Sequence, residues 1–295
     1  MNAPRPHDAR LSVGVVGAGR VGAVLGAALL RAGHDVIAVS AVSDGSRRRA
    51  ATLLPGVPVV DPDEVPRRAS LVLLAVPDDA LPGLVAGLAS TGALQAGQLV
   101  AHPSGRHGLQ VLEPATRRGC LPLALHPVLP FTGTEVDLAR LHGASFGVTS
   151  PEPLRPVAET LVLEMGGEPV WLSDELRPLW HAALAHGANH LVTLVASAAD
   201  LLRDAGVEEP GRVLAPLLGA ALDGSLRSGD AVLTGPVSRG DAETVKAHLD
   251  VLADSPVLAS YVALARLTAD RALASGRLDP HHAGALLEVL GTVAR

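Results

Sequence analysis

A G-x-G-x-x-G pattern runs from Gly17 to Gly22, directly after a strand-like run and at the start of a helix-like run. In this context Gly17 allows a tight turn, Gly19 lets a pyrophosphate approach the backbone, and Gly22 lets the helix pack on the strand. The first amides of the helix and its dipole favour a bound phosphate. The motif therefore predicts a dinucleotide site, with a ligand-free glycine turn as the alternative. The predicted cofactor-binding residues of this turn are Gly17, Gly19, Arg20, Val21 and Gly22.

The end of the second predicted strand indicates which dinucleotide binds. An NAD site places an acidic residue there, which binds the ribose 2′-hydroxyl. This sequence has Ser40 and Ser43, followed by the arginines 47–49, and its nearest acid, Asp44, lies beyond the strand. Hydroxyl and guanidinium groups suit a 2′-phosphate. We therefore predict NADP (NADPH) as the cofactor, bound through Ser40, Ser43 and Arg47, although a solvated helix face is the alternative for part of the arginine run.

Two further segments follow predicted strands. Val76-Pro77-Asp78 comes after the most apolar strand, and Ser104-Gly105 belongs to the segment HPSG. In a doubly wound sheet such segments lie at the carboxyl edge, where ligands bind. We predict that Val76, Pro77, Asp78, Ser104 and Gly105 bind the cofactor, with a helix N-cap as the alternative role of Asp78.

His102 and His126 each precede a proline at the end of a predicted strand. A histidine held at this edge can act as a general acid or base near neutral pH. The alternative for both is a loop histidine that is hydrogen-bonded to the backbone. We predict His126 as a catalytic residue.

A long helix predicted over 175–205 carries polar side chains along an otherwise apolar surface. At 100° per residue, Asn189 falls about 80° and His186 about 140° from His181. Buried polar groups need partners, so this stripe faces either another polar element or a ligand cleft. We predict His181, His186 and Asn189 as catalytic. A zinc site on His186 and His190 is a weaker alternative, because the glutamate of an H-E-x-x-H motif is missing, and no metal is predicted.

The segment LTGPVSRGD brings hydroxyls, free amides and an arginine to the start of a helix. Such a corner suits a substrate carboxylate. We predict that Thr234, Ser238 and Arg239 bind substrate. The alternative is an ordinary loop in which Ser238 or Asp241 caps the helix.

The composition excludes several classes of function. The 295 residues include 24 basic and 30 acidic side chains, and the net charge of −6 disfavours general nucleic-acid binding. A single cysteine excludes an intrachain disulfide or a CxxC zinc site and fits a reducing compartment. No secretory signal opens the chain, and the apolar run 178–199 contains three histidines and an asparagine. We therefore predict a buried central helix, no membrane partner and a cytoplasmic protein.

Apolar strands alternate with helices in the first half of the chain, a pattern typical of a parallel sheet covered on both faces. Strand signals stop after about residue 172, and the remainder predicts helices. We predict an α/β fold with a disordered tail (1–10), a doubly wound Rossmann domain (11–150) and an all-α substrate and dimerisation domain (151–295). The expected strands are 11–16, 35–40, 57–60, 70–76, 98–101, 120–125, 144–148 and 168–172.

As a set, the segments GAGRVG, LLAVPDDAL, HPSG, LHPVLPF, WHAALAHGANHLVTL and LTGPVSRGD resemble a group of bacterial NADP-dependent oxidoreductase-like proteins. These proteins pair a Rossmann domain with a helical domain of unknown function, and the resemblance covers about residues 10–270. The group is similar in architecture to pyrroline-5-carboxylate reductase, ketopantoate reductase, β-hydroxyacid dehydrogenase and prephenate dehydrogenase. The resemblance implies a helical domain like that of 6-phosphogluconate dehydrogenase, which closes over the nicotinamide and often forms a homodimer.

Only some of the catalytic residues of these related families have counterparts in this sequence. β-Hydroxyacid dehydrogenases have a catalytic lysine followed three residues later by asparagine, and at this spacing the chain has His186 and Asn189. The asparagine is retained and the lysine is not. Prephenate dehydrogenases have a catalytic histidine in a His-Pro loop, which His126-Pro127 resembles, although the rest of that loop differs.

These observations predict an NADP-dependent oxidoreductase that transfers a hydride to or from a small oxo-acid or imino-acid. A ketopantoate-like substrate is the first suggestion by analogy. The alternative from another class is a non-catalytic NADP(H)-binding redox sensor or regulatory protein, which the missing lysine favours.

Overall fold

The computed structural model describes residues 10–292, so the predicted tail over 1–10 lies outside the described residues except for Arg10. The chain divides into two compact units, Met1–Ala188 and Asn189–Arg295. The first unit extends beyond residue 150 because the strand at 168–171 still pairs with the sheet. The domain boundary near residue 150 stays a prediction.

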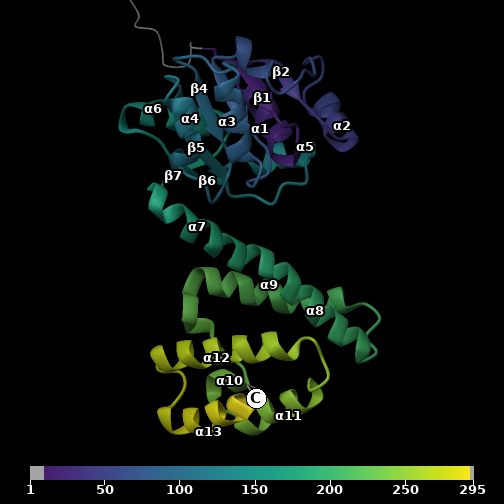
Figure 1. Ribbon diagram of the computed structural model, residues 1–295. Coiled ribbons are helices and arrows are strands. Elements are labelled where there is room, and N and C mark those ends of the chain that lie inside the picture. Colours follow the sequence, from purple (N-terminus) through teal and green to yellow (C-terminus); the bar gives the residue numbers. More distant parts are fainter. Residues whose placement is uncertain (1–9, 293–295) are drawn as a thin grey trace, which may run out of the picture. The chain divides into compact units, whose positions relative to one another are not determined.

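A seven-stranded sheet forms the centre of the first unit (Figure 1). Its strand order is β2-β1-β3-β4-β5-β6-β7, and the first five of these pair in parallel. The chain moves outward from β1 to β2 and returns to β3 on the other side of β1. The carboxyl edge between β1 and β3 is therefore the topological switch point at which such sheets bind ligands. The strands are β1 (Ser12–Val16), β2 (Asp35–Ser40), β3 (Leu71–Leu74), β4 (Leu99–His102), β5 (Leu121–Pro127), β6 (Ser145–Thr149) and β7 (Glu168–Trp171).

Helices cover both faces of the sheet, as the continuous apolar strands predict. On one face α1 (Arg20–Arg31), α2 (Asp44–Leu53) and α6 (Arg155–Glu164) share a core with β-strand side chains such as Val13 and Val15. On the other face α3 (Leu81–Ser90) and α4 (Glu113–Thr116) pack on Val72 and Val100. The predicted doubly wound α/β fold is confirmed.

Two details of the predicted sheet are wrong. The segment 57–60 is not a strand but contributes one bridge, between Val39 and Val59. β6 runs antiparallel to β5, and β7 follows β6. The connection from β5 to β6 contains only the six-residue α5 (Glu135–Arg140), whereas a parallel return usually needs a full crossover helix.

The long helix predicted over 175–205 is interrupted. It begins with α7 (Arg177–Leu184), passes through a π-helical segment (Ala185–Asn189) and continues as α8 (His190–Asp204) in the second unit. A π turn changes the angle per residue, so a wheel drawn at 100° does not hold across it. The predicted single polar stripe of His181, His186 and Asn189 is therefore wrong as drawn.

The second unit is entirely helical within the described residues. A core of side chains such as Val245, Val262 and Leu286 joins its last helices. In contrast, no residue of α8 is buried, so the prediction of a buried central helix is wrong for the single chain. The helices after α8 are α9 (Pro210–Ser228), α10 (Pro236–Arg239), α11 (Ala242–Val251), α12 (Leu258–Ala274) and α13 (Pro280–Gly291).

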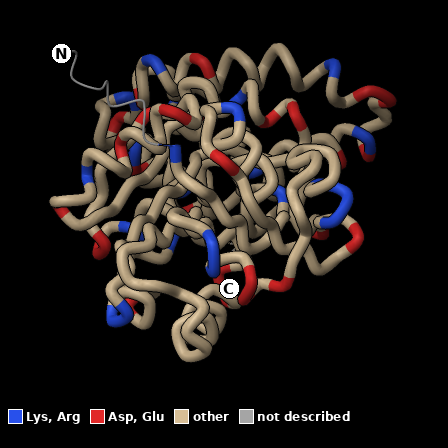
Figure 2. The backbone as a smooth tube through the Cα atoms, turned by 90° about the horizontal axis from the view of Figure 1, so that it is seen from above, with Lys and Arg blue, Asp and Glu red and all other residues tan. Residues whose placement is uncertain are grey.

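Charged residues of both signs are interspersed along the described backbone (Figure 2). Because charges of opposite sign alternate, neither sign produces a strong electrostatic potential over a large part of the surface. Among the helices of the described residues, none is both long enough and apolar enough to cross a membrane.

Candidate functional site

The glycine turn connects β1 to α1 at the switch point of the sheet. Gly17 has φ of 100°, and a Cβ there would lie 2.5 Å from the carbonyl oxygen of Ala75. A Cβ on Gly22 would lie 2.1 Å from the carbonyl oxygen of Gly17. Gly19 differs, because its nearest neighbour would be Ala75 O at 3.9 Å. The fold itself requires Gly17 and Gly22, whereas the space beside Gly19 is open for a ligand.

The hydroxyls predicted to bind a 2′-phosphate have partners within the protein. Ser40 Oγ accepts a hydrogen bond from Gly17 N at 2.9 Å, so this buried serine holds the glycine turn. Ser43 is the N-cap of α2 and accepts from Ser46 N at 3.1 Å. Arg49 donates from Nε to Ala18 O at 3.3 Å. Arg47 is exposed, and its side chain makes no hydrogen bond or ion pair with any described residue.

A loop that the sequence analysis did not single out also packs on the glycine turn. A Cβ on Gly133 would lie 3.0 Å from Arg20 Cγ and 2.8 Å from Arg49 Cδ. The fully buried carboxylate of Asp137 holds this loop by accepting from Thr132 N at 2.8 Å and Gly133 N at 2.7 Å. The loop and α5 thus remain at the carboxyl edge, which is consistent with the antiparallel return to β6.

The segments after β3 and β4 are tied to each other. The Asp78 carboxylate lies 3.6 Å from Arg106 Nε, and Asp78 O accepts from a ring nitrogen of His107 at 3.0 Å. The alternative role of Asp78 as a helix N-cap is wrong, because α3 begins at Leu81 and its N-cap is Ala80. Val76 is half-buried and Pro77 is exposed. Their cofactor contacts stay predictions.

His102 is a structural histidine. Its Nδ1 accepts from Ser104 N at 3.2 Å, so Nε2 carries the proton and donates to Gly108 O at 3.0 Å. Burial lowers the pKa of His102 to about 3, so the ring is neutral at physiological pH. Ser104 Oγ accepts from His107 N at 3.1 Å, which makes the segment a compact turn. The alternative of a backbone-bonded histidine is confirmed for His102.

His126 is half-buried at the end of β5. Its Nδ1 accepts from Trp180 Nε1 at 3.1 Å, so the neutral ring carries its proton on Nε2. A Cβ on Gly105 would lie 2.9 Å from this Nε2 and 2.6 Å from His181 Cδ2. The fold therefore brings together three predicted site residues, Gly105, His126 and His181. The rings of His126 and His181 meet edge to face, with centroids 6.0 Å apart.

The charge state of His126 is set by its surroundings. Burial, then the Arg177 cation and His181, lower the pKa of His126 to about 4, and Asp78 opposes them in part. The ring is therefore neutral near pH 7 and offers an N–H donor rather than an imidazolium proton. This geometry changes the predicted role of His126 from an ordinary acid to a neutral hydrogen-bond donor.

Arg177 is a residue that the sequence analysis did not single out. Its side chain is fully buried in the structure. Its Nε donates to Thr149 Oγ1 at 2.9 Å, and the remaining donors go to backbone carbonyls. Burial, opposed in part by the Asp174 carboxylate, lowers the pKa of Arg177 to about 10, so the side chain stays cationic near pH 7. Arg177 begins a helix shortly after Asp174 and Glu175, so no local sequence pattern marks it as buried. The accepting carbonyls are those of Ser104, Gly105, Ala124 and Gly147, at 2.9 to 3.4 Å.

The remaining predicted residues lie in or beyond the π segment. His186 is exposed on this segment and Asn189 is exposed at its end. π turns inside helices are frequent at functional sites. Within the described part of the chain, no three His, Cys, Asp or Glu side chains gather as a metal site would require.

The LTGPVSRGD segment does not form the preorganised carboxylate-binding site that the sequence predicts. Ser238 is buried, and its Oγ donates to Gly235 O at 3.1 Å. Asp241 is the N-cap of α11, which confirms the alternative role of that residue. Thr234 and Arg239 are exposed. Thr234 lines a hollow of about 330 Å³ in the helical unit, together with Tyr261 and other residues.

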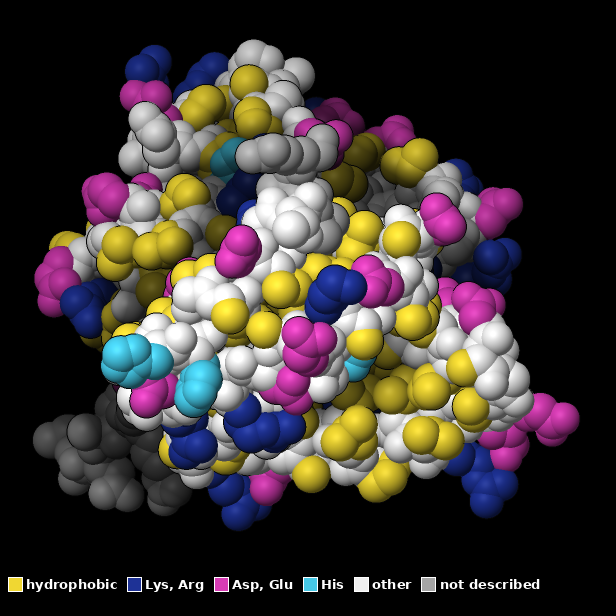
Figure 3. All heavy atoms as spheres, turned by 90° about the horizontal axis from the view of Figure 1, so that it is seen from below, with side chains coloured by type: hydrophobic (Ala, Val, Ile, Leu, Met, Phe, Trp, Pro, Cys, Tyr) yellow, Lys and Arg dark blue, Asp and Glu magenta, His cyan; other side chains and the backbone are white. Residues whose placement is uncertain are grey.

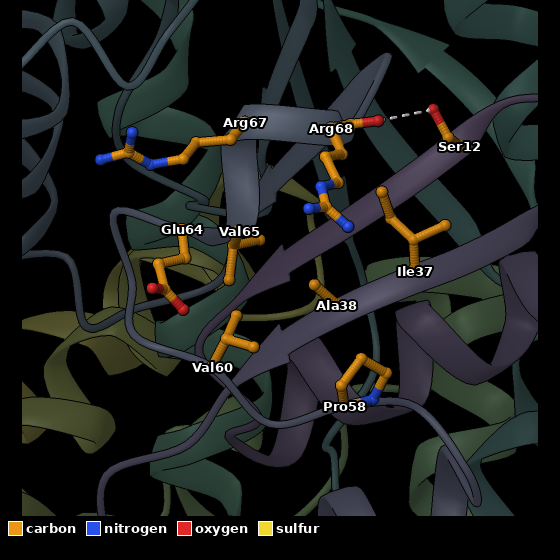
Figure 4. A pocket seen from close by; sticks show the side chains of 9 residues that line it. All are labelled: Ser12, Ile37, Ala38, Pro58, Val60, Glu64, Val65, Arg67 and Arg68. Atoms are coloured by element: carbon orange, nitrogen blue, oxygen red, sulfur yellow. Dashed lines mark hydrogen bonds between the residues drawn. The ribbon is translucent and has the colours of Figure 1, made fainter.

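A groove beside β1 and β2 contains no residue of the glycine turn in its lining (Figure 4). It has a volume of about 540 Å³ and is lined by β1 and β2 residues such as Ser12 and Ile37, with Arg68 turned toward it. None of the predicted site residues lines it. Its size therefore does not identify it as the functional site.

The fold and the glycine turn define a Rossmann-type protein with a helical second part. Comparison with family models bears this out, because a Rossmann-like domain matches residues 2–127. A domain of unknown function (DUF2520) matches residues 144–268. The chain thus combines a Rossmann-like domain with a DUF2520 domain, as the sequence resemblance implies. A search of curated proteins finds no significant match.

Solved structures share this fold over nearly their full length. A Bacteroides fragilis protein described as a candidate NADP oxidoreductase is 23% identical, with a TM-score of 0.76, over 88% of this chain and 98% of that chain. An Aspergillus terreus reductive aminase in complex with NADPH and ethyl levulinate is 18% identical, with a TM-score of 0.66, covering 95% and 99%. A Streptococcus pyogenes 1-pyrroline-5-carboxylate reductase is 15% identical, with a TM-score of 0.60, covering 89% and 98%.

Proposed function

We propose that this chain is an NADP-dependent oxidoreductase acting on a small oxo-acid or imino-acid. The observation that carries the proposal is the open space beside Gly19, at the N-terminus of α1 and the switch point of the sheet. The first turn of α1 contains no acidic side chain that would repel a phosphate. The similar structures include proteins whose descriptions name NADP or NADPH, which supports this choice of cofactor.

When bound, the cofactor would supply or accept a hydride. The glycine turn, with Arg20 and Val21, would hold its pyrophosphate. Val76, Pro77, Asp78, Ser104 and Gly105 would line its nicotinamide half. His126 would donate a hydrogen bond from Nε2 to the reacting heteroatom, with His181 beside it. His186 stays a predicted catalytic residue of the first unit. Asn189, Thr234, Ser238 and Arg239 belong to the second unit, and their substrate contacts stay predictions. A ketopantoate-like acid is the first substrate to test.

A redox sensor that binds NADPH without consuming it is the second candidate. It is favoured by the histidine at position 186, where the similar β-hydroxyacid dehydrogenases carry lysine. Turnover separates the two candidates, because a sensor consumes no NADPH with any oxo-acid. We place either activity in the cytoplasm, which fits the single, buried and free cysteine Cys120.

Arg47→Ala is expected to weaken NADPH binding about tenfold and to leave NADH binding unchanged, since one guanidinium–phosphate contact is worth roughly 1.4 kcal/mol. Arg47 is available for this role because its guanidinium has no partner among the described residues. Calorimetric titration of wild type and variant with both dinucleotides provides the measurement.

Arg31→Ala is the matched control for charge, because Arg31 is an exposed arginine in the last turn of α1, at the far end of the helix from the glycine turn. Wild-type protein that prefers NADH would contradict the 2′-phosphate assignment and leave the Rossmann site intact. Failure to bind either dinucleotide would contradict the proposed function as a whole.

We further propose that the helical unit forms a homodimer through α8 and α9. Both helices expose large apolar side chains, including Val192 at 71%, Leu217 at 66% and Leu226 at 79%. Apolar side chains also lie between charged ones on the face seen from below (Figure 3). Exposed apolar surface of this extent marks interaction sites in soluble proteins.

Light scattering is expected to give about twice the 30.0 kDa mass of one chain. Val192→Asp with Leu217→Asp should produce the monomer, because two carboxylates would be buried in the interface. Val251→Asp, on the 84% exposed position of α11, is the control that should stay dimeric. A monomeric wild type at micromolar concentration would rule out this dimer.

A further inference from the structure

We infer that the buried Arg177 cation, which acts on His126, makes this site selective for a neutral carbonyl compound over a cationic iminium. The inference rests on the proposed oxidoreductase function and narrows its substrate from two classes to one. It involves only residues of the first unit, which belong to β5, β6, α7 and the loops after β3 and β4.

The Arg177 guanidinium is surrounded by uncharged acceptors. All five of its N–H groups donate, one to the hydroxyl of Thr149 and four to backbone carbonyls. No carboxylate of the described residues lies within ion-pair distance of it. The Asp174 carboxylate acts on Arg177 from farther away, while its oxygens accept from Leu109 N at 2.9 Å. The site therefore contains a buried cation whose charge is only partly offset.

Arg177 donates hydrogen bonds to backbone carbonyls on both sides of His126. One Nη2 bond reaches the carbonyl of Ala124, two residues before His126 on β5. The other reaches the carbonyl of Gly147, which is paired with His126 across β5 and β6. The Nη1 bond at 3.4 Å reaches the carbonyl of Gly105, whose α-carbon faces His126 Nε2. The cation is thus fixed close to the ring by contacts to three backbone segments.

The groups that act on His126 favour its neutral form with a proton on Nε2. Trp180 Nε1 donates to Nδ1, which leaves Nε2 as the only ring donor. Arg177 and His181 on α7 oppose a positive ring, and Asp78 in the loop after β3 is the one acidic group acting against them. The site consequently presents a hydrogen-bond donor backed by a cation.

This arrangement matches the charge changes of carbonyl reduction. The carbonyl carbon accepts the hydride from NADPH, which leaves as NADP⁺, and the carbon–oxygen double bond becomes a single bond with the electron pair on oxygen. His126 Nε2 would hold this oxygen through a hydrogen bond, and a water molecule would supply the proton of the new hydroxyl group and leave as hydroxide. The Arg177 cation favours each anionic stage of this sequence. A neutral histidine donor works in this way in other enzymes.

A protonated iminium meets two obstacles at the same place. Its positive charge is repelled by Arg177, and its own N–H faces the N–H of His126 instead of an acceptor. Both effects favour the oxo-acid. Arg177 is a positioning residue in this scheme, because it acts through His126 and through the local field.

The first test is the state of His126 in the NADPH complex, measured by ¹⁵N NMR of the histidine rings. Wild type is expected to show a neutral His126 with the proton on Nε2 from pH 5 to 8. Arg177→Met removes the charge and Arg177→Lys retains it, while both lose hydrogen bonds. Only the Met variant should raise the pKa of His126 measurably, although burial still holds that pKa below its ordinary value, whereas a purely structural role would change both variants alike. A wild-type His126 that titrates near pH 6.5 overturns the inference.

The second test compares a matched pair of product analogues on the wild-type NADP⁺ complex at pH 7. These are 2-hydroxy-3-methylbutanoate and 2-amino-3-methylbutanoate, which differ in the charge at the reacting heteroatom. The hydroxy acid is expected to bind at least about tenfold more tightly. Equal binding, tighter binding of the amino acid, or binding of neither overturns the inference. Both wild-type tests start from an NADP(H) complex, so loss of the proposed function appears separately, as failure to bind the dinucleotide.

Discussion

Gly19→Val is expected to weaken NADPH binding by about 100-fold or more, equivalent to roughly 2.7 kcal/mol, while the protein stays folded. Gly19 has φ of −66° and ψ of −170°, which a valine can adopt. Apart from its neighbours in the chain, the nearest atom to the added Cβ is Ala75 O at 3.9 Å. The valine side chain would instead occupy the space in which a pyrophosphate approaches the backbone. Calorimetry gives the affinity and a thermal melt gives the stability.

Substitutions at two other glycines serve as controls for Gly19→Val. Gly87→Val, on the open surface of α3, adds the same atoms with nothing within 4 Å and should keep wild-type affinity. Gly17→Ala should destabilise the fold itself, because of the positive φ and the contact at 2.5 Å. NADPH affinity of Gly19→Val within threefold of wild type would mean that no pyrophosphate lies on this turn.

His126→Asn is expected to lower kcat/KM about 10²- to 10⁴-fold, with NADPH affinity nearly unchanged. The shorter amide cannot place a donor where Nε2 lies. His126→Gln, whose amide nitrogen reaches farther, should lose less. NADPH oxidation with the oxo-acid that wild type reduces fastest provides the measurement. Equal rates for all three proteins would remove His126 from the mechanism and leave His181 as the candidate.

The pH dependence gives an independent check on His126. Because its pKa is lowered to about 4, the ring stays neutral as pH falls from 8 to 5, and the rate should be flat with respect to this group. The rate should fall only as pH approaches 4, where protonation of Nδ1 breaks the bond from Trp180. A fall between pH 7 and 6 would show an ordinary histidine.

Several features of the site were predictable because they are local. The glycine turn is contiguous in sequence, and its backbone requirements follow from six residues, so the roles of Gly17, Gly19 and Gly22 follow from the sequence alone. The buried strands were equally predictable, since continuous apolar runs between helices indicate a sheet covered on both faces. The same local signals placed His126 and Gly105 at strand ends.

Other features followed from contacts that no local pattern encodes. Ser40 was predicted to meet a phosphate, yet its hydroxyl holds Gly17 N, because β2 lies beside β1. The histidine stripe was drawn on a regular helix, and a π segment interrupts it. β6 runs antiparallel because the connection that precedes it stays at one edge of the sheet.

The sequence by itself determined a Rossmann-type fold, a dinucleotide turn and a helical second part, since these depend on residues near one another in the chain. Only the tertiary structure decided the charge and tautomer of His126. Trp180 lies 54 residues from it in sequence, and the bonds of Arg177 span between 28 and 73 residues. A hydrogen bond over such a separation exists only once the sheet has brought its strands together, and the same burial that forms it sets the pKa.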